Sequence, residues 1–278
     1  MILSKKVLTI IISIISLILI IGGYFYLTKL SHQTISYRVP QAPLPETPKP
    51  EIKTKKLPIL IYHYVEINQD KKDTIRDSLN INPYVFEQQM QTLQKAGYKF
   101  IWPSELDQFM KDTSDQKYVM ITFDDGYATF YTQTYHFIKK NNVKVTNYII
   151  SDRIGYLNYM TKAQIHEILK DGLVELGSHT LTHPDLTSLS QEELKRQLSK
   201  SKLDLEKEFG VSIKSFCYPY GYYVPSIIPF VKEAGYDNAV TTKEGTIYNI
   251  DNKFEIKRFR AGYLTGDDLL AKIEKDNN

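Results

Sequence analysis

The chain has 278 residues, 42% of them hydrophobic, which is enough for one large domain or two small ones. Its formal net charge of +3 is accounted for by Lys5, Lys6 and Lys29, because residues 1–30 contain no acidic side chain. The remainder of the chain is balanced in charge and shows no pattern typical of nucleic-acid binding, so no nucleic-acid partner is expected. Cys217 is the only cysteine, which excludes an intrachain disulfide.

The chain begins with an apolar segment. Residues 7–28 are uncharged and mostly Ile and Leu, and as a helix these roughly 22 residues would cross a bilayer core. Lys5 and Lys6 precede the segment and favour a cytoplasmic N-terminus. A cleavable signal peptide is the alternative, because residues 21–23 end the run in small side chains, although no A-x-A pattern follows. We expect residues 1–30 to be an uncleaved, single-pass anchor that places the rest of the chain outside the cell membrane.

Residues 31–56 form a proline-rich stretch with few large apolar side chains. Proline favours extended backbone, and such a segment cannot build a core. We therefore expect an extracytoplasmic linker over 31–56 and a folded domain over 57–278.

Within 57–278, short apolar runs alternate with helical patterns. This alternation is typical of a mostly parallel sheet or a barrel. Asn82 and Pro83 are a cap and first residue typical of a helix start, and Ser190 caps another helix. Strands are predicted at 57–62, 99–101, 118–123, 144–150, 173–177, 215–218 and 238–242, and helices at 82–97, 130–140, 161–170, 190–209 and 226–234.

Two pairs of polar residues follow predicted strands, where functional groups collect in parallel α/β folds. Asp124 and Asp125 come after strand 118–123 and precede a glycine. His179 and His183 come after strand 173–177, four residues apart. Pro184 biases His183 away from helical backbone, so we expect a loop or single turn here.

One carboxylate and two imidazoles can bind a divalent metal ion and leave coordination positions open. The second carboxylate is then available as a base toward a metal-bound water. The pattern predicts a metal-dependent hydrolase. Taken singly, the two aspartates could be a helix cap or tight turn, and the two histidines part of a surface loop.

The segments 122–126 and 178–184 resemble the first two motifs of the polysaccharide deacetylases, the NodB-like carbohydrate esterase family four. The resemblance implies a distorted (β/α)7-type barrel over 57–278. It also implies that Asp124 is the general base and that Asp125, His179 and His183 bind the metal. Zinc is the ion implied first, with cobalt, nickel or other ions as alternatives.

Residues 216–221 resemble the third motif of that family, which implies that the Tyr220 backbone N–H, next to Pro219, helps to form an oxyanion hole. Cys217 stands where the family usually has an arginine. Residues 256–260 resemble a late segment of membrane-anchored members in which an arginine lies near the catalytic aspartate. Arg258 fits that position better than Arg260, and would orient Asp124 and keep it ionised. A solvated strand arginine is the alternative.

The family also uses a histidine as general acid, and none follows His183. His136 and His166 lie in helical patterns, whereas His63 ends the first predicted strand. This resembles circularly permuted members, chiefly those that act on poly-N-acetylglucosamine, in which the acid-bearing strand is N-terminal. The resemblance implies that His63 is the catalytic acid. A satisfied core histidine is the alternative.

The resemblance as a whole implies a hydrolase of carbon–nitrogen bonds that removes N-acetyl groups from N-acetylglucosamine-containing cell-envelope or extracellular polysaccharide. An O-acetyl (xylan-type) carbohydrate esterase and a non-catalytic wall-binding protein are the alternatives. The expected partners are the polysaccharide and the membrane, and nothing in the sequence indicates an obligate protein partner. Chitooligosaccharide, peptidoglycan glycan and poly-N-acetylglucosamine all remain open as the polymer.

Overall fold

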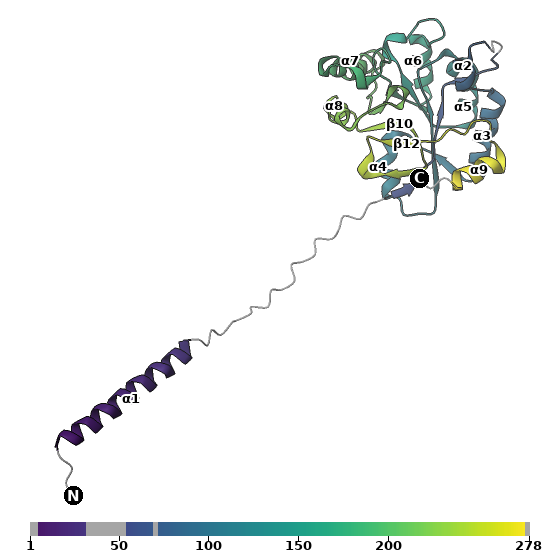
Figure 1. Ribbon diagram of the computed structural model, residues 1–278. Helices are drawn as coiled ribbons and strands as arrows, with labels where there is room; N and C mark the ends of the chain where they lie inside the picture. Colours follow the sequence, from purple (N-terminus) through teal and green to yellow (C-terminus); the bar gives the residue numbers. More distant parts are fainter. Residues whose placement is uncertain (1–4, 32–53, 69–71, 276–278) are drawn as a thin grey trace. The chain divides into compact units, whose positions relative to one another are not determined.

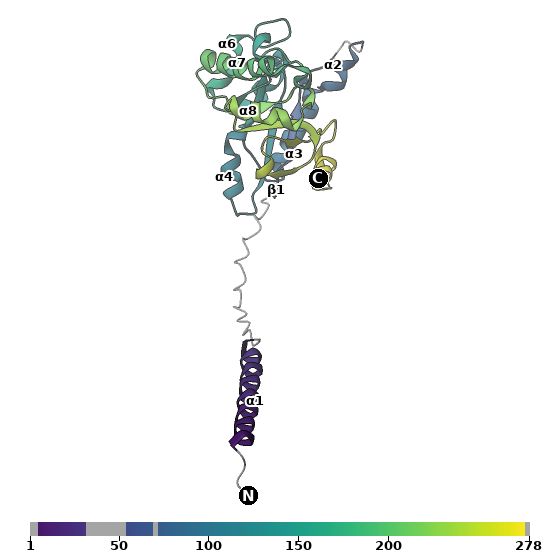
Figure 2. The same ribbon diagram turned by 60° about the vertical axis from the view of Figure 1, so that its left-hand side comes forward.

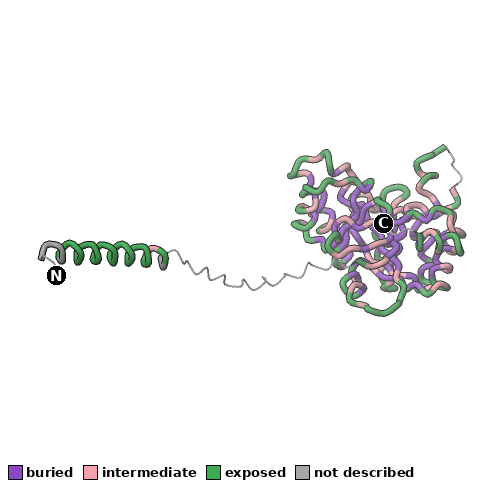
Figure 3. Tube along the Cα trace, turned by 60° about the horizontal axis from the view of Figure 1, so that its bottom comes forward, coloured by how far each residue is buried: buried purple, intermediate pink, exposed green. Residues whose placement is uncertain are grey.

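The computed structural model describes residues 5–31, 54–68 and 72–275, in two units that we treat separately. The first contains one helix, α1 (Lys5–Ser31). Its stretch Thr9–Lys29 has a mean hydropathy of 2.5, and by length and composition alone it could cross a membrane. The side chains of this stretch are almost all exposed (Figure 3). The predicted linker lies mostly outside the described residues.

The second unit is built on a nearly closed barrel of parallel strands. Phe259, directly after β12, completes the ring: its N–H donates to the Ile59 carbonyl at 2.7 Å, and its carbonyl accepts from the Ile61 N–H at 3.1 Å. The (β/α)7-type barrel is therefore confirmed for the described residues. Around the ring the order is β12 (Ile256–Arg258), β10 (Asn238–Glu244), β9 (Ser215–Cys217), β8 (Val174–Ser178), β7 (Val145–Ile149), β6 (Lys117–Phe123) and β2 (Ile59–Tyr62), with β5 (Tyr98–Phe100) added beside β6.

Helices surround this barrel, with α6 and α7 toward one end of the unit and α4 and α9 toward the other (Figures 1 and 2). The predicted caps are present, because the Asn82 and Ser190 side chains accept hydrogen bonds from N–H groups in the first turns of α3 and α7. The helices are α2 (Thr74–Leu79), α3 (Pro83–Lys95), α4 (Leu106–Lys111), α5 (Tyr135–Asn141), α6 (Lys162–Lys170), α7 (Gln191–Phe209), α8 (Ile228–Glu233) and α9 (Gly266–Lys275).

Some elements differ from the expectation. The helix predicted from residue 130 starts as a π-helix over Phe130–Thr134 and becomes α-helical only in α5. The end of the expected linker forms β1 (Thr54–Lys56), antiparallel to β11 (Ile247–Asn249). The folded unit thus includes residues before 57. Strands this short have no periodic signature of their own and exist because a distant partner pairs with them.

The strands are buried along most of their length. All four residues of β2 are buried, as are Val119 to Phe123 of β6, because helices cover the outside and side chains fill the inside of the barrel. Polar side chains of the barrel can therefore reach solvent only at the ends of the strands. His63, Asp124 and His179 each follow the last residue of a barrel strand, so the parallel arrangement brings them to one end.

Candidate active site

Asp124 and Asp125 enter the site from the end of β6, and both are buried, with exposed fractions of 2% and 6%. The backbone turns sharply here: Asp125 has φ +74° and Gly126 φ +81°. A Cβ on Gly126 would lie 2.9 Å from the Ile149 side chain, so this turn requires glycine. The left-handed turn directs two consecutive carboxylates into the same site.

His179 and His183 follow β8 in a non-helical loop, in agreement with the effect expected of Pro184. His183 has φ +63°, and its N–H donates to Thr180 Oγ1 at 2.9 Å. The two imidazole Nε2 atoms are 3.2 Å apart. His179 Nδ1 lies 2.8 Å from the Cys217 carbonyl, which places the proton on Nδ1 and leaves Nε2 free to bind a metal ion.

The Asp125 carboxylate completes a group that fits a metal ion. Its Oδ1 atom lies 3.4 Å from His179 Nε2 and 3.5 Å from His183 Nε2. Among the described residues this buried oxygen has no hydrogen-bond partner, and a cation would satisfy it. The three ligand atoms lie within 4.8 Å of one another. Two imidazoles and a carboxylate suit zinc and several other divalent ions, so the donors do not select the metal.

The protonation states also suit a metal ion. Burial lowers the pKa of His179 to about 4, and burial together with the neighbouring His179 lowers the pKa of His183 to about 3. Both imidazoles are therefore neutral at pH 7. Burial, followed by the charge of Asp124, raises the pKa of Asp125 to about 7. A bound cation would favour the ionised carboxylate.

A second cluster of donors, Asp124, His179 and Cys217, is less suitable. Burial holds the pKa of the Cys217 thiol well above its usual value, so the sulfur is not a thiolate. Both oxygens of Asp124 already accept hydrogen bonds from Arg258.

Arg258, at the end of β12, is the residue that contacts Asp124, whereas Arg260 is exposed. Its Nη1 and Nη2 atoms each donate to one Asp124 oxygen at 2.7 Å. The buried guanidinium also donates to the Thr241 carbonyl at 2.8 Å and to Thr122 Oγ1 at 3.1 Å. Burial alone would raise the pKa of Asp124, but the charge and hydrogen bonds of Arg258 outweigh it and hold that pKa well below its usual value.

His63, directly after β2, faces the same carboxylate, with Nε2 3.9 Å from Asp124 Oδ2 and 11% of its side chain exposed. Burial lowers its pKa to about 4, against the opposite effect of Asp124. The imidazole is therefore neutral at pH 7. His136 and His166 are exposed on α5 and α6, away from this cluster.

The loop after β9 places Tyr220 beside the histidines. Its ring centroid lies 4.5 Å from that of His183, and its hydroxyl donates to the His183 carbonyl at 3.4 Å. Tyr220 has φ +58° in a short turn that begins at the buried Pro219. The third predicted motif is therefore part of the same site.

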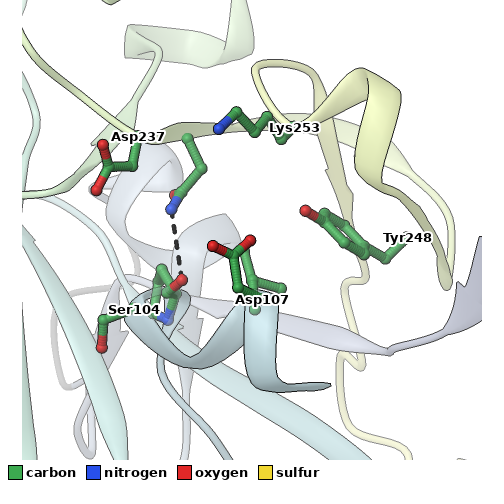
Figure 4. Close-up of a pocket in the computed structure, with 8 residues that line it drawn as sticks. Ser104, Asp107, Asp237, Tyr248 and Lys253 are labelled. Carbon is green, nitrogen blue, oxygen red and sulfur yellow. Dashed lines mark hydrogen bonds between the residues drawn. The ribbon is translucent and has the colours of Figure 1, made fainter. Parts of the chain in front are cut away.

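A separate pocket of about 200 Å³ lies at the other ends of the strands (Figure 4). The Asp107 carboxylate, the Lys253 ammonium and the Tyr248 hydroxyl point toward it, and Asn238 begins β10 there. None of the predicted site residues lines this pocket.

The sequence interpretation did not include Thr122 or Thr241 among the partners of Arg258, nor the thiol of Cys217, which Arg258 Nη2 approaches to 3.2 Å. One feature of the sequence does indicate that Arg258 is buried. Side chains alternate between the two faces of a strand, so Arg258 lies on the same face as the apolar Ile256 and not on that of Lys257. Both Ile256 and Arg258 are buried.

Comparison with known proteins shows a likeness to one family. Residues 111–239 match the polysaccharide deacetylase family model. YxkH of Bacillus subtilis (strain 168), named provisionally as a polysaccharide deacetylase, is 29% identical over 80% of this chain and 77% of its own length. The poly-beta-1,6-N-acetyl-D-glucosamine N-deacetylase of Staphylococcus aureus (strain MRSA252) is 28% identical over 68% of this chain and 69% of its own.

Among solved structures, the Streptococcus pyogenes deacetylase PplD in complex with acetate superposes with a TM-score of 0.72 and 29% identity, covering 79% of this chain and 98% of that one. Asp124, Asp125, His179 and His183 lie inside the range that matches the family model. The two motifs follow β6 and β8, which β7 separates in the barrel. In sequence and in fold this chain is similar to the polysaccharide deacetylases, and its homologues support a hydrolase of the polysaccharide N-deacetylase type.

Proposed function

We propose that this protein removes acetyl groups from N-acetylglucosamine units of an extracellular or cell-envelope polysaccharide, with a divalent metal ion, zinc in the first place, as cofactor. One observation carries the proposal: the convergence of Asp125, His179 and His183 beside an Asp124 that Arg258 keeps ionised. The relative from S. aureus is named for deacetylation of poly-beta-1,6-N-acetyl-D-glucosamine, and PplD is a deacetylase seen with acetate.

Asp125, His179 and His183 would hold the ion, which when bound polarises the acetamide carbonyl and acidifies a water molecule. Asp124 acts as the general base and accepts a proton from the attacking water. Because its pKa is low, Asp124 is a weak base and can accept a proton only from a water whose own pKa is lowered. Arg258 orients both carboxylate oxygens, and the Tyr220 N–H donates to the oxygen on which negative charge develops.

His63 supplies the proton that the leaving amine needs. Since its pKa is about 4, the resting imidazole is neutral and must first gain a proton. Asp124 Oδ2, 3.9 Å away, holds the proton taken from water and can pass it on. The balance is one amide and one water converted to acetate and an ammonium group, which receives both protons of the water, and both side chains return to their initial states.

The helix α1 is assigned as a single-pass membrane anchor, residues 31–56 as the linker and the barrel as the extracytoplasmic part. The apolar stretch Thr9–Lys29, with Lys5 and Lys6 before it, supports this orientation. Protease treatment of intact cells with a permeable wall should release a fragment that begins within 31–56. A fully protected barrel in such cells would contradict the assignment.

The proposed activity is tested by measuring acetate release from chitooligosaccharide, peptidoglycan glycan and poly-N-acetylglucosamine by the full-length chain in detergent. Release should require added metal and should disappear in the Asp124→Asn variant. Activity on O-acetylated xylan together with none on the three N-acetylated polymers would contradict the proposal.

A further inference from the structure

The loop between β9 and α8 holds two tyrosine rings in solvent. The exposed fractions are 53% for Tyr220 and 58% for Tyr222, and their ring centroids are 5.7 Å apart. Tyr223 turns inward instead, where its ring stacks on Tyr218 at 4.8 Å and its hydroxyl donates to Glu255 at 2.6 Å. The loop is therefore anchored through one tyrosine while its neighbours remain exposed.

The backbone beneath the exposed rings is fixed. Gly221 has φ +73°, and a Cβ there would lie 1.9 Å from Thr242 Oγ1. Thr242 Oγ1 donates to the Tyr220 carbonyl at 3.1 Å, and the Tyr222 N–H donates to the Pro219 carbonyl at 3.0 Å. An exposed ring on a fixed backbone gains little from folding, but it can bind a ligand without a loss of backbone freedom. Two neighbouring exposed aromatic rings offer a ligand a small apolar surface.

This surface is continuous with the active site, because the Tyr220 ring packs against His183, one of the three candidate metal ligands. The faces of a pyranose ring carry C–H groups, which pack well on an aromatic face. Two rings whose centroids are 5.7 Å apart can each lie under one of two neighbouring sugars. A polysaccharide that enters the metal site must extend beyond it, and Tyr222 lies on one such path.

We propose that Tyr222, next to Tyr220, is a substrate-binding residue on which the sugar adjacent to the reacting N-acetylglucosamine stacks, so that this site binds a segment of polymer rather than a single sugar. The proposal rests on the proposed function, because it takes the polysaccharide as the ligand. It adds a specificity determinant outside the metal site, supplied by the aromatic face of Tyr222.

Binding is measured by calorimetry with the metal-loaded, full-length chain in detergent and the β-1,6-linked glucosamine pentamer. This probe is the fully deacetylated product, so binding is measured without turnover. Tyr222→Ala should raise Kd by about tenfold, whereas Tyr222→Phe and Tyr222→Trp should stay near wild type. Tyr84→Ala is the matched control, since Tyr84 is a tyrosine of similar exposure (68%) on α3. An unchanged Kd in Tyr222→Ala, or no binding by the wild type, overturns the proposal.

Kinetics with the N-acetylated pentamer provide the second measurement. Tyr222→Ala should raise KM by about tenfold and change kcat by less than about twofold, the pattern of lost uniform binding. Equal losses in kcat for the Ala, Phe and Trp variants would show a structural role and overturn the proposal. If the wild type binds the product pentamer more tightly than Tyr222→Ala does but releases no acetate, the proposed function fails and the role of Tyr222 in binding the polymer stands. If the wild type releases acetate and Tyr222→Ala binds the pentamer as well as the wild type does, the proposed function stands and the role of Tyr222 fails.

Discussion

The guanidinium of Arg258 and the carboxylate of Asp124 form a buried, two-point ion pair, with both N–O distances at 2.7 Å. The two residues are 134 positions apart in the sequence. The arginine approaches from the last barrel strand and the aspartate from the end of β6. The pair therefore joins the two strands that flank β2 in the closed ring, and it determines both the direction and the ionisation of the proposed base.

Arg258→Gln should move the acidic limb of the kcat/KM profile to higher pH. Without the arginine, burial dominates and raises the pKa of Asp124, so the base becomes protonated at a pH where the wild type is still active. The loss should be larger at pH 5 than at pH 8. Arg258→Lys keeps the charge without the two-point geometry and should be intermediate. Arg260→Gln is the matched control, and a profile of Arg258→Gln parallel to the wild type would contradict the role.

Removal of one partner from this pair should also destabilise the fold. An uncompensated buried carboxylate typically costs about 3–5 kcal/mol. Chemical unfolding of Arg258→Gln, compared with Arg260→Gln, measures this cost. A difference within about 0.5 kcal/mol, the range of ordinary surface substitutions, would show that water or another group satisfies Asp124.

Much of the site followed from local pattern. The apolar runs before Asp124 and His179 predicted strands, and parallel strands bring their ends together. Arg258 was harder to assign, because its contact with Asp124 depends on closure of the barrel between β2 and residue 259. Closure is a contact between distant segments and has no local signature. The same reason explains why the sequence does not predict β1 and β11. Each is three residues long and forms only because it pairs with the other.

The exposed tyrosines of the loop after β9 illustrate a different limit. Tyr220, Tyr222 and Tyr223 are alike in sequence, and nothing local distinguishes the anchored ring from the free ones. The distinction depends on Tyr218, on which the Tyr223 ring stacks, and on Glu255, to which the Tyr223 hydroxyl donates. Tertiary contacts therefore decided which tyrosines face solvent.

Metal retention should depend on each predicted ligand. His179→Ala and His183→Ala remove one of three donors and should abolish retention of zinc after gel filtration, along with acetate release. His166→Ala removes an exposed histidine on α6 and serves as the control. Elemental analysis of the purified proteins gives the stoichiometry. Stoichiometric metal in either ligand variant would assign the ion to other donors.

The stability of the metal-free protein should fall in acid partly through His63. Its pKa is about 4 in the folded state, against about 6.5 when unfolded, so the unfolded chain binds more protons between these values. The corresponding stability is complete above pH 6.5 and is lost as the pH falls to 4, up to roughly 3 kcal/mol. Denaturant unfolding across this range should show a weaker pH dependence for His63→Gln than for wild type. Equal slopes would contradict the lowered pKa.

The proposed acid role of His63 predicts a loss of rate without a loss of metal. His63→Ala should slow amide hydrolysis by roughly 10²–10⁴, the usual contribution of a positioned proton donor. An ester should be affected less, because an alkoxide leaves more easily than an amine and needs less help from an acid. The measurement is kcat for an N-acetylated oligomer and for an activated acetate ester, with metal content determined in parallel. Amide hydrolysis within a few-fold of wild type would show that the proton reaches the amine from another group.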